Sequence, residues 1–79
     1  MSVKILYFAS LADRAGCSEE TVDVNSSTAK SIYEEARQRH GFAFGVDILR
    51  VAVNGAFVSW DSAVHEADEI AFIPPVSGG

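Results

Sequence analysis

A single amphipathic segment, with strand-like segments on both sides, is the feature that most constrains how this chain can fold. Between Thr28 and Gly41 apolar residues recur at the i, i+3, i+4 and i+7 spacing of one helix face: Ala29, Ile32, Tyr33 and Ala36. Thr28 is the expected N-cap, and Gly41 is expected to end the helix in a left-handed conformation. One helix covers only one face of a sheet, so we expect an α+β domain whose other sheet face stays open.

The polar side of this helix carries charges. Glu35 and Arg39 lie four residues apart, a spacing that predicts an ion pair. His40 follows Arg37 and Arg39 in the last turn, where cations are favoured by the helix dipole. We therefore interpret His40 as a helix-end residue rather than as a metal ligand or a base.

The flanking segments are predicted strands by their apolar and β-branched composition: residues 3–9, 21–24, 49–53, 57–58 and 70–73. Asn54-Gly55 predicts a type I′ hairpin turn, because both residues tolerate a positive φ. Residues 10–18 read as a loop or a short helical turn, and residues 42–47 as irregular. The first and last strands are the most apolar, which fits the parallel central pair of a β-grasp fold over residues 1–73.

Three apolar residues have two possible places in this fold. Phe8, Phe57 and Ile73 could form an exposed patch on the open face of the sheet, which would mark an interaction surface. The alternative is that they belong to the core, and strand parity alone does not decide between the two.

The C-terminal segment is distinctive. Two prolines, Pro74 and Pro75, stop the last strand and begin an extended tail over residues 74–79. Gly78 and Gly79 have no side chain beyond Cα, so they would pass through a narrow channel with the terminal carboxylate leading. We expect this tail to be the functional part of the chain, the alternative being an unused terminus.

The composition excludes several classes of function. A net charge of −5 opposes nucleic-acid binding, and no apolar run reaches the length of a membrane span. We expect a cytoplasmic protein. Its one cysteine, Cys17, cannot form an internal disulfide, and the two histidines lack the cysteine partners of a zinc site.

No constellation of an activated nucleophile, a P-loop or a dinucleotide turn is present. Asp68-Glu69 is better explained as a solvated turn than as an acid–base pair. The chain therefore has the features of a carrier or partner protein, without a metal.

Taken together, these segments resemble the MoaD family, the ubiquitin-like sulfur carriers that form the small subunit of molybdopterin synthase. The resemblance rests on residues 5–9, the helix after Thr28, residues 51–54 and, above all, residues 68–79, where the family ends in Pro-Pro-Val, a small residue and Gly-Gly. It departs at Ala67, where the family has a turn glycine. If that glycine has a positive φ in the family, either Ala67 is strained or the turn differs here.

The resemblance implies a mechanism for the tail. A partner adenylating enzyme would use ATP to activate the Gly79 carboxylate, and sulfur transfer would convert it to a thiocarboxylate. The chain would bind no cofactor itself. It would then donate sulfur to the cyclic pyranopterin precursor in the large synthase subunit, whose residues perform the catalysis, within a heterotetramer of two copies of each subunit.

The resemblance also implies which residues contact partners. The expected apolar contacts are Phe8, Phe57 and Ile73, with Pro74, Pro75, Val76 and Ser77 in the channel and Gly78 giving clearance. Asp61, Asp68 and Glu69 are weaker candidates for polar contacts. The alternatives are a sulfur carrier for thiazole synthesis or tRNA thiolation, a ubiquitin-like protein modifier, and a plain interaction domain.

Overall fold

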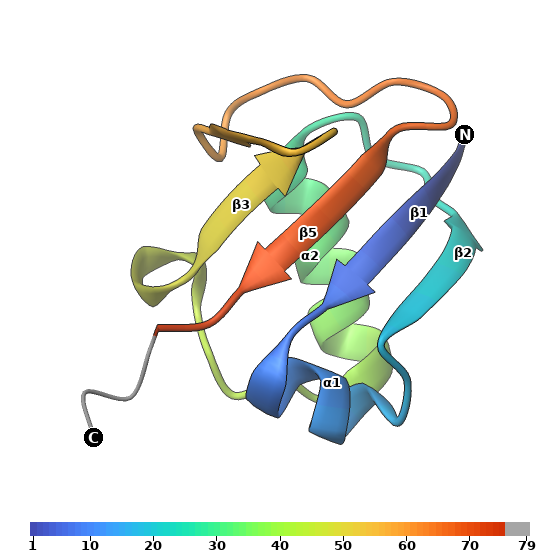
Figure 1. Ribbon diagram of the computed structural model, residues 1–79. Helices are drawn as coiled ribbons and strands as arrows, with labels where there is room; N and C mark the ends of the chain where they lie inside the picture. The colour runs from blue at the N-terminus through green and yellow to red at the C-terminus, as the bar shows by residue number, and fades with distance from the viewer. Residues whose placement is uncertain (76–79) are drawn as a thin grey trace.

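The computed structural model describes residues 1–75, which form one mixed sheet with a long helix packed behind it (Figure 1). The elements in chain order are β1 (Ser2–Tyr7), α1 (Ala9–Ala15), β2 (Glu19–Asp23), α2 (Ala29–His40), the short 3₁₀ helix η1 (Val46–Ile48), β3 (Arg50–Val53), β4 (Ala56–Val58) and β5 (Glu69–Ile73). Every predicted strand is present. The first strand, however, ends at Tyr7 rather than at residue 9, because the chain turns there into α1.

The strand order of the sheet is β2-β1-β5-β3-β4. The first and last strands run parallel, and Tyr7 is paired with Phe72 at the end of their register. The other neighbouring strands are antiparallel. The predicted β-grasp arrangement, with β1 beside a central β5, is confirmed.

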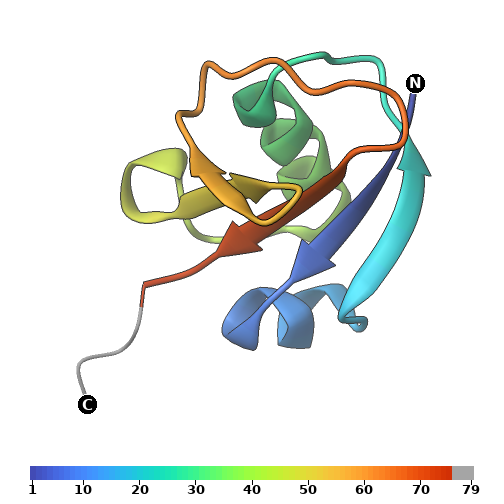
Figure 2. The ribbon, with the colours of Figure 1, turned by 45° about the horizontal axis from the view of Figure 1, so that its top comes forward.

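Helix α2 lies across one face of the sheet (Figure 2). Its four predicted apolar residues are all buried in the core. Its N-cap is Thr28, whose hydroxyl oxygen accepts a hydrogen bond from the Ser31 amide at 3.3 Å. Gly41 ends the helix in the left-handed conformation with a φ of 73°. Both predicted helix ends are confirmed.

Aromatic side chains fill the centre of the space between α2 and the sheet. The ring of Tyr33 on α2 packs edge-on against Phe72 of β5 with ring centroids 5.0 Å apart, and Trp60 stacks on Phe72 at a centroid distance of 6.0 Å. The rings of Tyr33 and Trp60 also contact each other, at 5.7 Å. The hydroxyl of Tyr33 donates a 2.6 Å hydrogen bond to the Phe44 carbonyl. The buried phenol is therefore hydrogen-bonded, and this hydrogen bond also holds the loop after α2 in place.

The structure differs from three other predictions. Most of residues 10–18, predicted as a loop or a short helical turn, belong to helix α1, whose Leu11 is buried. Residues 46–48, at the end of the segment predicted as irregular, form a turn of 3₁₀ helix. The expected Glu35–Arg39 pair is replaced by longer-range contacts. Arg39 binds Glu20 of β2 at 2.9 Å, and Glu35 accepts a hydrogen bond from the hydroxyl of Ser26. For Arg39 and Glu35, partners on other segments of the chain thus replace the expected partner four residues away on the helix.

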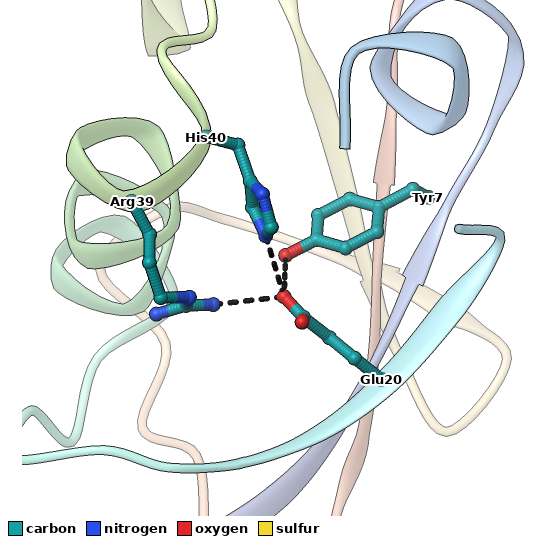
Figure 3. A network of polar contacts seen from close by, with 4 residues as sticks. All are labelled: Tyr7, Glu20, Arg39 and His40. Carbon is teal, nitrogen blue, oxygen red and sulfur yellow. Dashed lines mark hydrogen bonds and ion pairs between the residues drawn. The ribbon is translucent and has the colours of Figure 1, made fainter. Parts of the chain in front are cut away.

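A polar network joins the end of α2 to β1 and β2 (Figure 3). One carboxylate oxygen of Glu20, Oε1, accepts hydrogen bonds from the Tyr7 hydroxyl at 2.6 Å and from the Arg39 guanidinium at 2.9 Å. The Nε2 atom of His40 lies 2.8 Å from the same oxygen. Because Tyr7 is almost fully buried, this carboxylate keeps a core hydroxyl satisfied.

The network shifts the protonation equilibria of its members. Partial burial of Glu20 opposes its charge, but the hydrogen bonds from Tyr7, His40 and Arg39 outweigh burial and lower its pKa to about 2. Burial, followed by the adjacent Glu20 carboxylate, raises the pKa of Tyr7. Glu20 is therefore charged and Tyr7 neutral throughout the physiological range.

We expect Glu20 to make the stability of the fold depend on pH. Its pKa is lower in the folded chain than in the unfolded chain, so its contribution is complete above about pH 4.5 and is lost as the pH falls towards 2. Urea unfolding at a series of pH values should show a shallower loss for Glu20→Gln than for the wild type. At pH 7 the variant should be less stable by about 2–3 kcal/mol, because the neutral amide cannot replace the hydrogen bonds made to a charged carboxylate.

The matched control is Glu19→Gln on the same strand. Glu19 forms an exposed ion pair with Lys4 at 2.8 Å, so its loss should change stability by less than about 0.5 kcal/mol. Parallel pH profiles for wild type and Glu20→Gln would contradict the assignment.

The turn before β5 contains a strained residue. Ala67 has a φ of 69°, as the sequence comparison with a turn glycine anticipated. Its amide donates to the carbonyl of Ser2 at 2.8 Å, and the carboxylate of Asp68 accepts from Asn54 at 3.0 Å and from the His65 amide at 2.9 Å. These contacts to β1 and to the neighbouring hairpin hold the turn in place despite its strain.

Ala67→Gly should therefore stabilise the protein. Relief of the left-handed conformation exceeds the entropy cost of glycine, leaving a gain of about 0.5–1 kcal/mol. For a domain of this size, that gain corresponds to a rise in Tm of roughly 2–8 °C by thermal unfolding. A lower Tm would show that the Ala67 side chain contributes to packing that the strain argument omits.

Candidate functional site

The root of the tail lies where the two parallel strands end together. Because Tyr7 is paired with Phe72, the next residues along the two strands, Phe8 and Ile73, emerge side by side although 65 positions separate them in the sequence. Pro74 is buried at this point and Pro75 is exposed. The tail thus leaves the fold from a fixed, central position (Figure 1).

An apolar hollow of about 730 Å³ opens beside this point. We call its lining the tail-root surface, which consists of Phe8, Ala9, Ser10, Phe44, Ile73, Pro74 and Pro75. Phe44 reaches it from the loop after α2, where the hydrogen bond from Tyr33 holds its carbonyl. The hollow is therefore built from three separate segments of the chain.

A second apolar feature crosses the open face of the sheet. The register pairs Leu6 with Ala71, Ala71 with Ala52, and Ala52 with Phe57, so these four side chains form one row on the face opposite α2. We call them the sheet row. Phe57 ends the row on β4 with 60% of its surface exposed.

Charged residues flank the sheet row on the same face. Lys4 contacts Glu19 at 2.8 Å and Glu69 at 3.8 Å, and the hydrogen bond and charge of Glu19 raise the pKa of the Lys4 amine. On the other side, the guanidinium of Arg50 stacks over the ring of Phe57 at 4.4 Å. An apolar centre with a charged rim is the usual anatomy of a protein interface.

The structure resolves the question left open for the three predicted apolar contacts. Phe8 is 46% exposed, Phe57 is more exposed still, and Ile73 is partly exposed, so the core alternative is wrong for all three. Phe8 and Ile73 share the tail-root surface, whereas Phe57 belongs to the sheet row.

The remaining predicted residues have different surroundings. Asp61 is exposed, and Glu69 lies at the rim beside Lys4. Both carboxylate oxygens of Asp68 are engaged within the turn, where the His65 amide and then Asn54 lower its pKa, so its evident role is structural. The predicted tail residues Val76, Ser77, Gly78 and Gly79 lie outside the described residues.

Sequence reasoning missed several members of these surfaces. Phe44 lies in a segment without periodicity, and Ala9 and Ser10 were assigned to a strand end and a loop. The sheet row could have been derived from strand parity once the Asn54-Gly55 hairpin had set the register of β3 and β4.

Among residues 1–75, no group of three or more His, Cys, Asp or Glu side chains comes together that could hold a metal ion. Cys17 is partly exposed in the connection between α1 and β2 and packs against the edge of the core. None of the described helices is both long and apolar enough to span a bilayer.

Two phenylalanines on the two faces of the sheet should respond differently to truncation. Phe57→Ala removes an exposed ring and should cost less than about 1 kcal/mol of stability. Phe72→Ala removes a fully buried ring and should cost about 3–5 kcal/mol by urea unfolding. Equal losses would mean that Phe57 supports the fold rather than an external surface.

Known proteins match nearly the whole length of this chain. The model of the ThiS family matches residues 5–79. The molybdopterin synthase sulfur carrier subunit of Escherichia coli is 32% identical over 98% of this chain and 99% of its own length. The human protein of the same name is 35% identical over 98% of this chain and 93% of its own.

A solved structure agrees with these sequence matches. SAMP1 from Haloferax volcanii covers all of both chains with a TM-score of 0.82 and 31% identity.

Proposed function

This chain belongs to the ThiS family, and from that membership we propose that it is the sulfur carrier subunit of a molybdopterin synthase. The observation that carries the proposal is the extent of the similarity. Relatives with that name match this chain from end to end, at a similar total length. The shared region therefore includes the fold, the tail root and the tail.

The proposed chemistry takes place at the carboxylate of Gly79. In a partner enzyme, this carboxylate would attack the α-phosphorus of ATP, forming an acyl-adenylate and releasing pyrophosphate. A sulfur nucleophile would then displace AMP and leave a thiocarboxylate. Activation is needed because a free carboxylate is a poor electrophile. The partner enzyme would bind the ATP, and the carrier, which we propose to be cytoplasmic, would bind no cofactor of its own.

In the second half of the cycle the thiocarboxylate would donate sulfur to the pyranopterin precursor, and water would restore the carboxylate. The carrier needs no catalytic side chain for this step, because the large subunit of the synthase would supply the catalytic residues. We propose an assembly with two copies of each subunit.

The geometry of the tail root supports this role. A carrier must present its terminus away from its own surface, and β5 directs the chain outward from the centre of the sheet (Figure 2). Burial of Pro74, together with the fixed φ of both prolines, limits the directions that the tail can take. A restricted tail loses less entropy when it enters a narrow channel.

The two apolar surfaces support docking on a larger partner. We propose that Phe8, Ile73 and Phe57 are the principal apolar contacts, since aromatic side chains are enriched at the centres of protein interfaces and Ile73 adjoins Phe8. Pro75 and the residues after it would enter the channel. Asp61 and Glu69 remain candidates for contacts at the rim.

The test is intact-protein mass spectrometry after incubation with the adenylating enzyme, ATP and a sulfur donor. We expect a mass gain equal to the exchange of one oxygen for one sulfur, mapped to the fragment that contains Gly79. A variant with one alanine added after Gly79 should fold normally. It should, however, support no synthesis of molybdopterin when it is mixed with the large subunit and the precursor. An unchanged mass with an active enzyme would overturn the proposal.

A protein modifier is the second candidate, because SAMP1, known also as small archaeal modifier protein 1, is similar in both fold and sequence. A modifier would use the same activation but end in an isopeptide bond to a lysine of another protein. Adducts of higher mass in cells, absent when Gly79 is deleted, would favour this candidate. Binding to the large synthase subunit without adducts would favour the carrier.

A further inference from the structure

Ala9 has an unusual backbone conformation for its residue type. It is the first residue of α1, yet its φ is 49°, in the left-handed region. An L-residue with a Cβ is strained there, and alanine has no side-chain polar group to compensate, unlike Asn54 in the hairpin. Such strain persists only where the surrounding structure imposes it.

Two buried residues on either side impose it. Tyr7, the last residue of β1, lies in the core, and its amide donates to the Ser18 carbonyl at 2.9 Å. Leu11, four residues later, is also buried, and its amide donates to the carbonyl of Phe8 at 3.1 Å. The chain turns from strand β1 into helix α1 between these two residues, and Ala9, with its positive φ, lies in that turn.

The turn at Ala9 holds the end of β1, where Phe8 lies, because the hydrogen bond from the Leu11 amide of α1 returns to the Phe8 carbonyl. Phe8 itself is extended, with φ −122° and ψ 150°, so its side chain continues the outward alternation of β1 and cannot enter the core. It lines the tail-root surface together with its neighbours Ile73 and Ala9. Ala9, the strained residue, thus directly follows the exposed Phe8 in the chain, at the point where the tail leaves the fold.

We propose that Ala9 is a positioning residue for docking: its left-handed conformation holds Phe8 in place on the tail-root surface before the partner binds. This inference rests on the proposed function. Glycine would adopt the same φ without strain, but it would also allow many other conformations at this exposed position. Phe8 would then have to be ordered during binding, at a cost in affinity.

The experiment compares wild type, Ala9→Gly and Ala67→Gly in two measurements, Tm and Kd for the purified large subunit of molybdopterin synthase. Ala9→Gly should raise Tm by several degrees, because strain is relieved, yet weaken binding by about fivefold. Ala67→Gly relieves the same kind of strain in the turn before β5. It should raise Tm without changing Kd.

A double-mutant cycle shows whether Ala9 acts through Phe8. In a Phe8→Ala background, Ala9→Gly should leave Kd unchanged within about twofold, because the side chain that it positions is gone. A fivefold loss that persists in this background would overturn the inference. So would an Ala9→Gly variant that binds as tightly as wild type, or one whose Tm falls.

The result also separates this inference from the function on which it rests. If the wild type fails to bind the large subunit, the proposed partner is wrong. If the wild type binds and Ala9→Gly binds equally well, the carrier function stands and the positioning role of Ala9 is wrong.

Discussion

The parallel pairing of β1 with β5 is the contact on which the rest of the structure depends. It joins the first and last strands of the described chain, and it places β5 between β1 and β3 at the centre of the sheet. The same pairing brings Phe8 next to Ile73 and sets the point at which the tail leaves the domain. Fold and site are therefore consequences of one register.

The two faces of the sheet divide stability from recognition. On one face Phe72, Tyr33 and Trp60 pack around each other beneath α2, and the Glu20 network satisfies the Tyr7 hydroxyl at the margin of that core. The other face has no helix over it among the described residues. Its apolar row ends in the exposed ring of Phe57 and has a charged rim, the arrangement typical of a protein interface.

Local signals in the sequence predicted most of the fold. Thr28 acts through its own side chain, and Gly41 and Asn54-Gly55 act through their backbone preferences; each behaves as expected. Contacts between distant segments were harder to predict. Arg39 pairs with Glu20 on another strand rather than with Glu35 on its own helix, and Phe44 lines the tail-root surface although its segment has no hydrophobic periodicity. The left-handed conformation of Ala9 also depends on tertiary structure, because it results from the burial of residues on both sides.

The late position of β5 in the chain has a consequence for how the protein is made. Until residues 69–73 have left the ribosome, β1 and β3 lack the strand that separates and pairs them, so the sheet cannot close during synthesis of the earlier segments. Folding must therefore follow synthesis of residues 69–73, because the central pairing of β5 joins segments that lie far apart in the sequence. A chain truncated before β5 would remain unfolded and open to proteolysis. Every molecule that survives in the cell would therefore already possess the base of its tail.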